Sequence, residues 1–323
     1  MITFDLKTLP DWETLAQGKC LLQIVARAEN LIDSNKSDPI EFTREAPPDY
    51  LCFTAEKAMS TVAMAVNGTP TKGQAFETST DGTNWSVFTP GTTKITLANA
   101  GDKVYFRGDN TTVSESNATY YKFVMSGKIA ASGNIMSLLD KTCQSTIISN
   151  DCCYWYMFNG CRSLITAPAL PATTLARNCY TEMFRGCTSL TTAPALPATT
   201  LTSGCYISMF YGCTSLTTAP ALPATKLAGR CYCGMFQDCT SLTTAPELPA
   251  TTLVNFCYQS MFSGCTSLKI SSTQTGEYTI AWRIPSTGKI KSTATQWNVN
   301  MLTNTGGTFT GNPSINTTYY GAW

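Results

Sequence analysis

The sequence predicts an α+β protein, with small antiparallel β modules first, then a leucine-rich-repeat-like solenoid and a C-terminal cap. Two observations predict the solenoid: a Cys-Tyr pair recurs every 26 residues, and a Met-Phe pair follows it in step. A fixed period of this length is typical of a solenoid, because one unit cannot bury its apolar face alone and stacks on a neighbour. The β modules are predicted by short alternating runs separated by turn residues.

The composition restricts the classes of function. The 323 residues contain no histidine, which removes Ser-His-Asp and Cys-His catalysis and imidazole metal sites. Only 13% of residues are charged and the net charge is +1, so no overall field favours nucleic acid. The sequence also lacks paired carboxylates suited to glycoside hydrolysis and lacks phosphate-binding glycine motifs. We therefore predict no enzyme activity, no cofactor, no metal and no nucleic-acid partner.

Targeting signals are not evident at the start of the chain. Residues 1–7 carry no basic region followed by an apolar core, so we expect no secretory leader. No apolar stretch approaches the roughly 20 residues that a membrane span needs, so we expect no membrane span.

Residues 1–46 are predicted to form a β segment. Strands are expected at 21–28 and 40–43, with turn chemistry between them. Residues 9–12, Gly18, 24–28 and 33–37 resemble the closing strands of fibronectin type III-like modules. The resemblance implies a partial Ig/fibronectin III-like segment, which other virion or surface proteins would complete.

Residues 47–132 are predicted to form a small antiparallel β-sandwich. Paired prolines at Pro47 and Pro48 mark the linker before it. The turn signals are Asn67-Gly68 and Asp81-Gly82. The predicted strands are 51–54, 61–66, 75–79, 94–97, 103–107 and 120–124.

Residues 133–270 are predicted to be the solenoid, and residues 271–323 its cap. Cys179, Met183 and Cys187 stand at i, i+4 and i+8, which places them on one face of a short helix. Gly186 can end that helix. Pro194 and Pro197 make the following segment extended. Each turn is therefore predicted to contain one short strand and one short helix.

The repeated cysteines are predicted to be buried thiols rather than disulfides. Within one unit two cysteines are eight residues apart, roughly 12 Å along a helix at about 1.5 Å per residue, too far for a bridge. A bridge between stacked units stays open as the alternative. We expect these residues to form a ladder in the core: Cys153, Cys161, Cys179, Cys187, Cys205, Cys213, Cys231, Cys239, Cys257 and Cys265.

The repeated string Met-Phe-x-Gly-Cys-Thr-Ser-Leu-Thr-Thr-Ala-Pro-Ala-Leu-Pro-Ala resembles the BspA-like leucine-rich repeats of gut bacteria and their phages. Members of that family are surface proteins implicated in adhesion, and others are virion proteins. The resemblance therefore implies display and contact rather than catalysis.

Comparison of the repeats with one another identifies candidate binding residues. The two positions after each Cys-Tyr pair and the position after each Met-Phe pair vary, whereas the Thr-Ser-Leu and Thr-Ala-Pro strings are fixed from Cys187 onward. Variable positions either form a contact surface or are unconstrained solvent positions. The threonines, by contrast, repeat almost unaltered, as an array for a glycan or as strand surface residues. The candidate binding residues are Trp155, Tyr156, Glu182, Arg185, Ile207, Tyr211, Gln237 and Gln259.

These expectations together predict a non-enzymatic structural and binding protein. We expect a phage virion protein, such as a fibre, decoration or tail accessory protein, that presents its repeats to a host surface protein or glycan. The alternative is a bacterial cell-surface adhesin whose leader lies outside this chain. We also expect a homo-oligomer.

Overall fold

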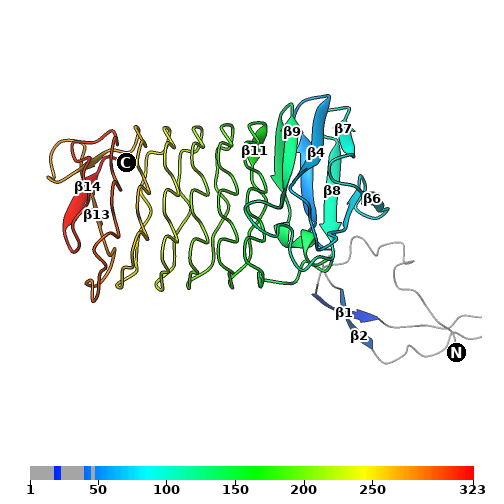
Figure 1. Cartoon of the computed structure of the whole chain (residues 1–323), viewed down its shortest axis with the longest axis horizontal. Coiled ribbons are helices and arrows are strands. Elements are labelled where there is room, and N and C mark those ends of the chain that lie inside the picture. The colour runs from blue at the N-terminus through cyan, green and yellow to red at the C-terminus, as the bar shows by residue number, and fades with distance from the viewer. Residues whose placement is uncertain (1–17, 23–39, 45–47) are drawn as a thin grey trace, which may run out of the picture. The chain divides into compact units, whose positions relative to one another are not determined.

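The computed structural model describes residues 18–22, 40–44 and 48–323 (Figure 1). The chain divides into two compact units, Met1–Pro48 and Asp49–Trp323. In the first unit β1 (Gly18–Leu22) pairs antiparallel with β2 (Ile40–Arg44). The rest of the predicted fibronectin-like segment lies outside the described residues.

The second unit begins with two β-sheets packed face to face. One sheet has the order β11-β10-β3-β8-β5-β6, and the other has the order β7-β4-β9. Buried and half-buried residues alternate along β4, as expected for a strand with one face in a core. The strands are β3 (Leu51–Ala55), β4 (Ser60–Asn67), β5 (Phe76–Ser79), β6 (Ser86–Phe88), β7 (Lys94–Leu97), β8 (Lys103–Gly108), β9 (Tyr120–Ser126), β10 (Ile129–Ser132) and β11 (Leu164–Thr166).

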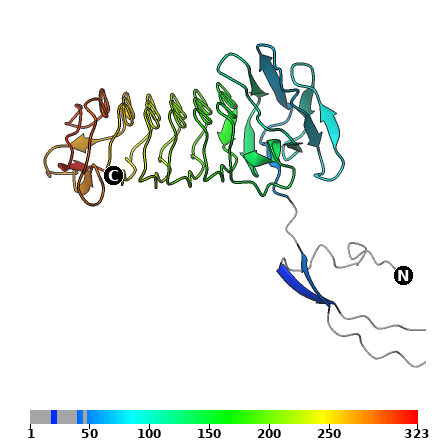
Figure 2. The same ribbon diagram turned by 60° about the horizontal axis from the view of Figure 1, so that its bottom comes forward.

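The 26-residue repeats form coils that stack side by side along the molecule (Figures 1 and 2). We number them coil 1 (153–178), coil 2 (179–204), coil 3 (205–230) and coil 4 (231–256); coil 5 begins at Cys257. Parallel bridges join equivalent threonines of successive coils, Thr166 to Thr192, Thr192 to Thr218 and Thr218 to Thr244. The coils are therefore in register.

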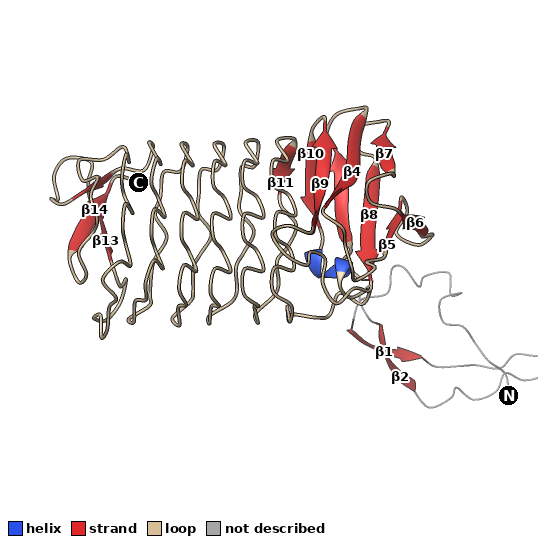
Figure 3. Ribbon diagram, in the orientation of Figure 1, coloured by secondary structure: helices blue, strands red, loops and turns tan. Residues whose placement is uncertain are grey.

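The α+β prediction is wrong. The described residues contain strands, turns and loops, and their only helical piece is the 3₁₀ helix η3 (Ile135–Leu138) (Figure 3). The predicted leucine-rich-repeat-like solenoid, with one short helix in each repeat, is wrong for the same reason. In place of that helix each coil has a run of tight turns over its first nine residues, which we call the turn segment.

The backbone of the turn segment explains why no helix forms. In coil 2 every fourth residue has a positive φ: Asn178 (54°) directly before the turn segment, and Glu182 (52°) and Gly186 (70°) within it. An α-helix of L-residues excludes this conformation. The backbone N–H groups therefore alternate between acceptors in the same coil and acceptors in the next coil. Met183 N donates within the coil to Tyr180 O at 3.2 Å, whereas Glu182 N donates to Ile207 O of the next coil at 2.8 Å. Backbone amides that would bond within a helix therefore bond to carbonyl groups of the neighbouring coil.

The core of the stack consists of side chains repeated in columns. The tyrosine rings of successive turn segments stack with centroids 5.7–5.9 Å apart. The phenylalanine rings form a second column with centroids 5.2–5.8 Å apart. The tyrosine column runs from Tyr154 to Tyr258 and the phenylalanine column from Phe158 to Phe262, and both are fully buried.

The ten cysteines of the predicted ladder are all buried and all free. From coil 2 onward the second cysteine of each coil donates its thiol to a phenylalanine carbonyl of the preceding coil, as Cys213 Sγ does to Phe184 O at 3.1 Å. In coil 1 the acceptor is Phe123 O of β9. Burial raises the pKa of Cys213 to about 12, because a thiolate is poorly solvated there. The thiols therefore act as core residues that also satisfy a carbonyl group.

Both ends of the stack are covered by the chain itself. At the N-terminal end Phe123 of β9 donates its N–H to Met157 O at 2.8 Å and stacks its ring on Phe158 at 5.3 Å. At the other end a last incomplete coil, 297–305, accepts a hydrogen bond from Tyr258 N at Trp297 O. A three-stranded sheet follows, in the order β12-β14-β13, made of β12 (Ile270–Ser271), β13 (Ile280–Arg283) and β14 (Thr318–Gly321).

Within the described part of the chain no helix has the length and apolar character needed to cross a membrane, as predicted.

Candidate contact surfaces

The turn segments place the variable side chains of successive coils in one row. Register between coils puts equivalent residues next to one another, because each coil hydrogen-bonds to the next at the same positions. Tyr156, Glu182 and Ser208 are equivalent in this sense and share a positive φ of 62°, 52° and 48°. We call the following residues the variable row: Tyr120, Tyr156, Asn159, Glu182, Arg185, Tyr211 and Asp238.

The row begins with an aromatic cluster. The ring of Tyr156 lies 4.8 Å from that of Tyr120 on β9 and 5.7 Å from that of Trp155, edge to face in both pairs. The indole Nε1 of Trp155 is buried and has no hydrogen-bond partner among the described residues. Aromatic rings fixed by their neighbours lose little entropy when a ligand binds.

Polar side chains continue the row across coils 2 and 3. Arg185 Nη1 lies 2.7 Å from Glu182 Oε2, and the Arg185 guanidinium lies 4.6 Å from the centre of the Tyr211 ring. Asn159 of coil 1 donates from Nδ2 to Glu182 Oε2 at 3.5 Å. An exposed ion pair contributes little stability, so the main effect of these contacts is to hold the side chains in fixed positions.

Electrostatics links the row to coil 4. A hydrogen bond with Asp238 and burial raise the pKa of Tyr211 above its ordinary value near 10. The hydrogen bond to Glu182 likewise raises the pKa of Arg185. The arrangement therefore presents alternating aromatic, cationic and anionic groups in a chain of contacts from coil 1 to coil 4.

The structure brings together four of the eight predicted binding residues: Tyr156, Glu182, Arg185 and Tyr211. Trp155 supports Tyr156 from the side. Gln259 accepts a hydrogen bond from the Cys233 thiol at 3.6 Å, in a separate contact. Ile207 and Gln237 are half-buried, and neither side chain forms a hydrogen bond to a member of the row among the described residues.

The binding residues predicted from the sequence leave out three members of the row: Tyr120, Asn159 and Asp238. Asn159 occupies a variable position directly after a Met-Phe pair. Asp238 stands where the other coils have glycine, at Gly160, Gly186, Gly212 and Gly264, and it keeps their positive φ. That departure is a usable signal, because an aspartate in a strained glycine position needs a reason. Tyr120 has no such signal, since it comes from a strand outside the repeats.

On the face that carries the repeated threonines, side-chain hydroxyls form hydrogen bonds between neighbouring coils. Thr191 Oγ1 donates to Ile165 O at 3.3 Å and Thr243 Oγ1 donates to Thr217 O at 3.2 Å, each spanning one repeat. A hollow of about 500 Å³ on this face is lined by hydroxyl groups, among them Ser163, Ser189 and Ser215. These hydrogen bonds between coils favour a structural role for the threonine array over a role in binding a glycan.

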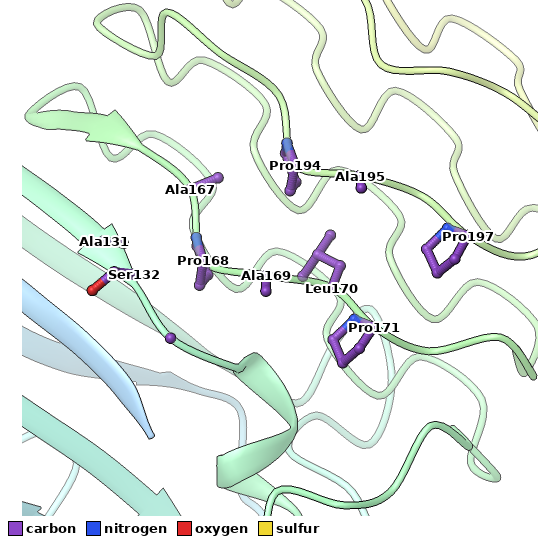
Figure 4. Close-up of a pocket in the computed structure, with 11 residues that line it drawn as sticks. Ala131, Ser132, Ala167, Pro168, Ala169, Leu170, Pro171, Pro194, Ala195 and Pro197 are labelled. Carbon is purple, nitrogen blue, oxygen red and sulfur yellow. The ribbon is translucent and has the colours of Figure 1, made fainter. Parts of the chain in front are cut away.

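A third surface is apolar and was not predicted from the sequence. It consists of residues 167–171, 193–197, 219–223 and 245–249, which we call the Ala-Pro face. The structure has three hollows on it, of about 530, 390 and 410 Å³. Figure 4 shows the first, where Pro168–Pro171 of coil 1 runs beside Pro194, Ala195 and Pro197 of coil 2.

The prolines explain these hollows. Two prolines in each segment remove two amide donors, and no described backbone hydrogen bond joins 193–198 to 219–224. The neighbouring coils therefore remain slightly apart at this face, although they are bonded on both sides of it.

The described residues include no group of three or more side chains arranged to hold a metal ion. Comparison with known proteins finds no family that matches the sequence. Neither the curated proteins nor the solved structures provide a match.

Proposed function

We propose that this chain is a non-enzymatic structural and binding protein displayed on a surface, and that the variable row is its contact surface. The observation that carries the proposal is the chain of contacts from Asn159 through Glu182 and Arg185 to Tyr211. The Tyr120–Tyr156 aromatic pair lies at the start of the same row. The scaffold beneath these residues repeats almost unchanged, while the residues in the row differ from coil to coil. A row of variable side chains on a repeated frame is typical of repeat proteins that bind partners.

The chemistry of the row favours a polar ligand with flat apolar faces. Tyrosine, tryptophan and arginine are the residues that dominate binding energy at interfaces. Glu182, Asn159 and Asp238 add hydrogen-bonding groups between the rings. A host glycan, or a polar protein surface with exposed aromatic groups, fits this set.

For the setting we propose a phage virion, with the chain as a fibre, decoration or tail accessory protein. The support is the resemblance of the repeats to BspA-like proteins of gut bacteria and their phages. The second candidate is a bacterial cell-surface adhesin of the same type. Neighbouring capsid and tail genes would favour the first setting, and neighbouring surface-export genes the second.

Binding of the labelled full-length chain to a panel of intact gut bacteria and to a mucin layer tests the contact surface. We expect binding to at least one surface, and we expect Arg185→Ala with Tyr211→Ala to weaken it at least tenfold, since each residue of this type typically contributes more than about 1 kcal/mol at an interface. The matched control is Thr199→Ala with Thr225→Ala, at exposed positions outside the row.

Two results would contradict the proposal. The first is equal binding by the row variant and the wild type. The second is turnover of a host glycan by the purified protein, which would make the chain an enzyme.

A further inference from the structure

Positive charge collects along one edge of the stack, outside the variable row. The last six residues of each coil are equivalent from coil to coil, and a parallel bridge joins Thr200 of coil 2 to Lys226 of coil 3. The same bridge joins Thr252 of coil 4 to Ser292, so residues 289–294 continue this edge in register. We call its five cations the basic edge: Arg177, Lys226, Arg230, Lys289 and Lys291.

The five residues of the basic edge are all exposed, and none forms an ion pair within the described part of the chain. The segments that carry them contain no aspartate or glutamate. Asp151 stands at the position equivalent to Arg177, one repeat earlier, and its carboxylate accepts the backbone N–H of Arg177 at 2.9 Å. The basic edge therefore concentrates positive charge in a chain whose net charge is only +1.

The cations occupy alternate coils. One lies in coil 1, two lie in coil 3 and two lie in coil 5, while the same segments of coils 2 and 4 are uncharged. The tyrosine column follows this edge closely in the sequence, and its rings are 5.9 Å apart between coils 2 and 3 and 5.8 Å apart between coils 3 and 4. Because these rings are nearly parallel, their spacing is the step from one coil to the next. The charged groups along the edge are therefore two coil steps apart.

Arg230 is held in a position from which it can meet an acidic group. Its guanidinium lies 4.9 Å from the centre of the Phe256 ring of the next coil. Stacking on a ring restricts the guanidinium while its N–H groups stay available. The planar guanidinium can donate two parallel hydrogen bonds to a carboxylate or to a comparable oxyanion.

We propose that the basic edge binds a linear anionic glycan with one acidic group on every second sugar. A sugar in an extended chain is about as long as one coil step, so the acidic groups of such a glycan meet the cations of coils 1, 3 and 5. A patch of one sign also attracts a ligand of the opposite sign before contact. The site is separate from the variable row and does not depend on the function proposed for that row.

The spacing of the cations disfavours nucleic acid as the ligand. Each strand of a duplex carries one phosphate about every 3.4 Å, so cations two coil steps apart would leave most phosphates of a strand without a partner. Among the described residues, Phe256 is the one aromatic ring stacked with a cation of the edge. Binding of single strands typically uses several aromatic side chains on which successive bases stack.

Titration calorimetry of the full-length chain with hyaluronan oligosaccharides tests the proposal, because hyaluronan has one carboxylate on every second sugar. We expect the affinity to rise with length until the oligosaccharide has about six sugars, enough to place three carboxylates along coils 1 to 5, and to change little beyond that. Hyaluronan whose carboxylates are converted to methyl esters should not bind. Added salt should weaken binding, since the Debye length is about 10 Å at 0.1 M ionic strength.

Lys226→Thr with Arg230→Asn removes the two cations of coil 3. Coils 2 and 1 have these residues at the equivalent positions, Thr200 and Asn178. Asn178 has a positive φ of 54°, close to the 58° of Arg230, so the variant should keep its fold. Its dissociation constant for the six-sugar oligosaccharide should be at least tenfold that of the wild type.

The matched control is Lys94→Thr with Arg162→Asn, which removes the same charge at exposed positions outside the edge and should bind like the wild type. The row variant, Arg185→Ala with Tyr211→Ala, should also bind hyaluronan like the wild type, because it leaves the basic edge intact. The proposal would be overturned by a wild type that does not bind hyaluronan, by equal binding of the methyl ester, or by unchanged affinity of the coil 3 variant. An equal loss in the control or the row variant, or tighter binding of a single-stranded oligonucleotide of the same charge, would overturn it as well.

Discussion

Replacing one ring of the phenylalanine column by leucine should cost more in the middle of the stack than at its end. Phe210 stacks on two neighbours, Phe184 and Phe236, with both centroid distances 5.6 Å and interplanar angles of 2° and 4°. Phe262 stacks on Phe236 alone, at 5.8 Å, and the last incomplete coil has Leu302 in the next position of the column. Both rings are fully buried.

The size of the effect follows from the number of stacked ring pairs that each substitution removes. An aromatic pair contributes about 0.5–1.5 kcal/mol beyond its buried area. Phe210→Leu loses two pairs and Phe262→Leu loses one, while the loss of packing volume is the same in both. The free energy of unfolding should therefore fall by about 1 kcal/mol more for Phe210→Leu than for Phe262→Leu.

Urea denaturation of the two variants in reductant, followed by tyrosine and tryptophan fluorescence, measures this difference. Equal losses in the two variants would refute the reasoning, because they would mean that ring stacking between coils adds nothing to burial. A larger loss at Phe262 would refute it as well.

Two further predictions concern the cysteine thiols. Burial raises the pKa of Cys161, Cys205 and Cys213 from 9.0 to about 12. The folded chain therefore retains protons that the unfolded chain releases near pH 9. The stability from these groups is complete below pH 9 and is lost as the pH rises toward 12, by up to about 1.4 kcal/mol per pH unit for each group. The urea midpoint should therefore fall sharply between pH 8 and pH 10.5, and an unchanged midpoint would contradict the burial of these thiols. The ten ladder cysteines should also resist a thiol reagent at pH 8 until urea unfolds the chain, whereas the half-buried Cys143, Cys152 and Cys233 react first. Mass spectrometry identifies the labelled cysteines. Rapid labelling of Cys187 or Cys213 in the folded chain would show that these thiols become accessible without unfolding, against the prediction.

The repeat could be read from the sequence because each coil places the same residue in the same environment. The Cys-Tyr and Met-Phe pairs are buried in every coil, as in Cys179, Tyr180, Met183 and Phe184. The helix could not be excluded by the positions at i, i+4 and i+8 alone. A period of four residues, with two adjacent residues buried each time, drifts by about 40° per step from the 3.6-residue period of a helix. That drift was the available sign that the segment is a run of turns.

The candidate site was only partly predictable. Internal comparison of the repeats identified Tyr156, Glu182, Arg185 and Tyr211, because variation within one chain is visible in the sequence. It could not identify Tyr120, which reaches the row through the packing of β9 on coil 1. The Ala-Pro face was missed because the sequence shows only that a proline lacks the N–H that a strand ladder needs. It does not show that neighbouring coils leave a hollow where those hydrogen bonds are missing.

Each 26-residue coil is an equivalent unit that hydrogen-bonds to its neighbours in register. Deletion of residues 205–230 removes one complete coil and joins Gly204 to Cys231, so coil 2 should stack directly on coil 4. The most direct measurement is urea unfolding of this deletion variant beside a variant that lacks only 205–217. We expect a single cooperative transition for the whole-coil deletion, at a lower urea concentration than for the wild type, and no folded baseline for the half-coil deletion. A whole-coil deletion that fails to fold, or a half-coil deletion that folds equally well, would mean that the coils are not equivalent units.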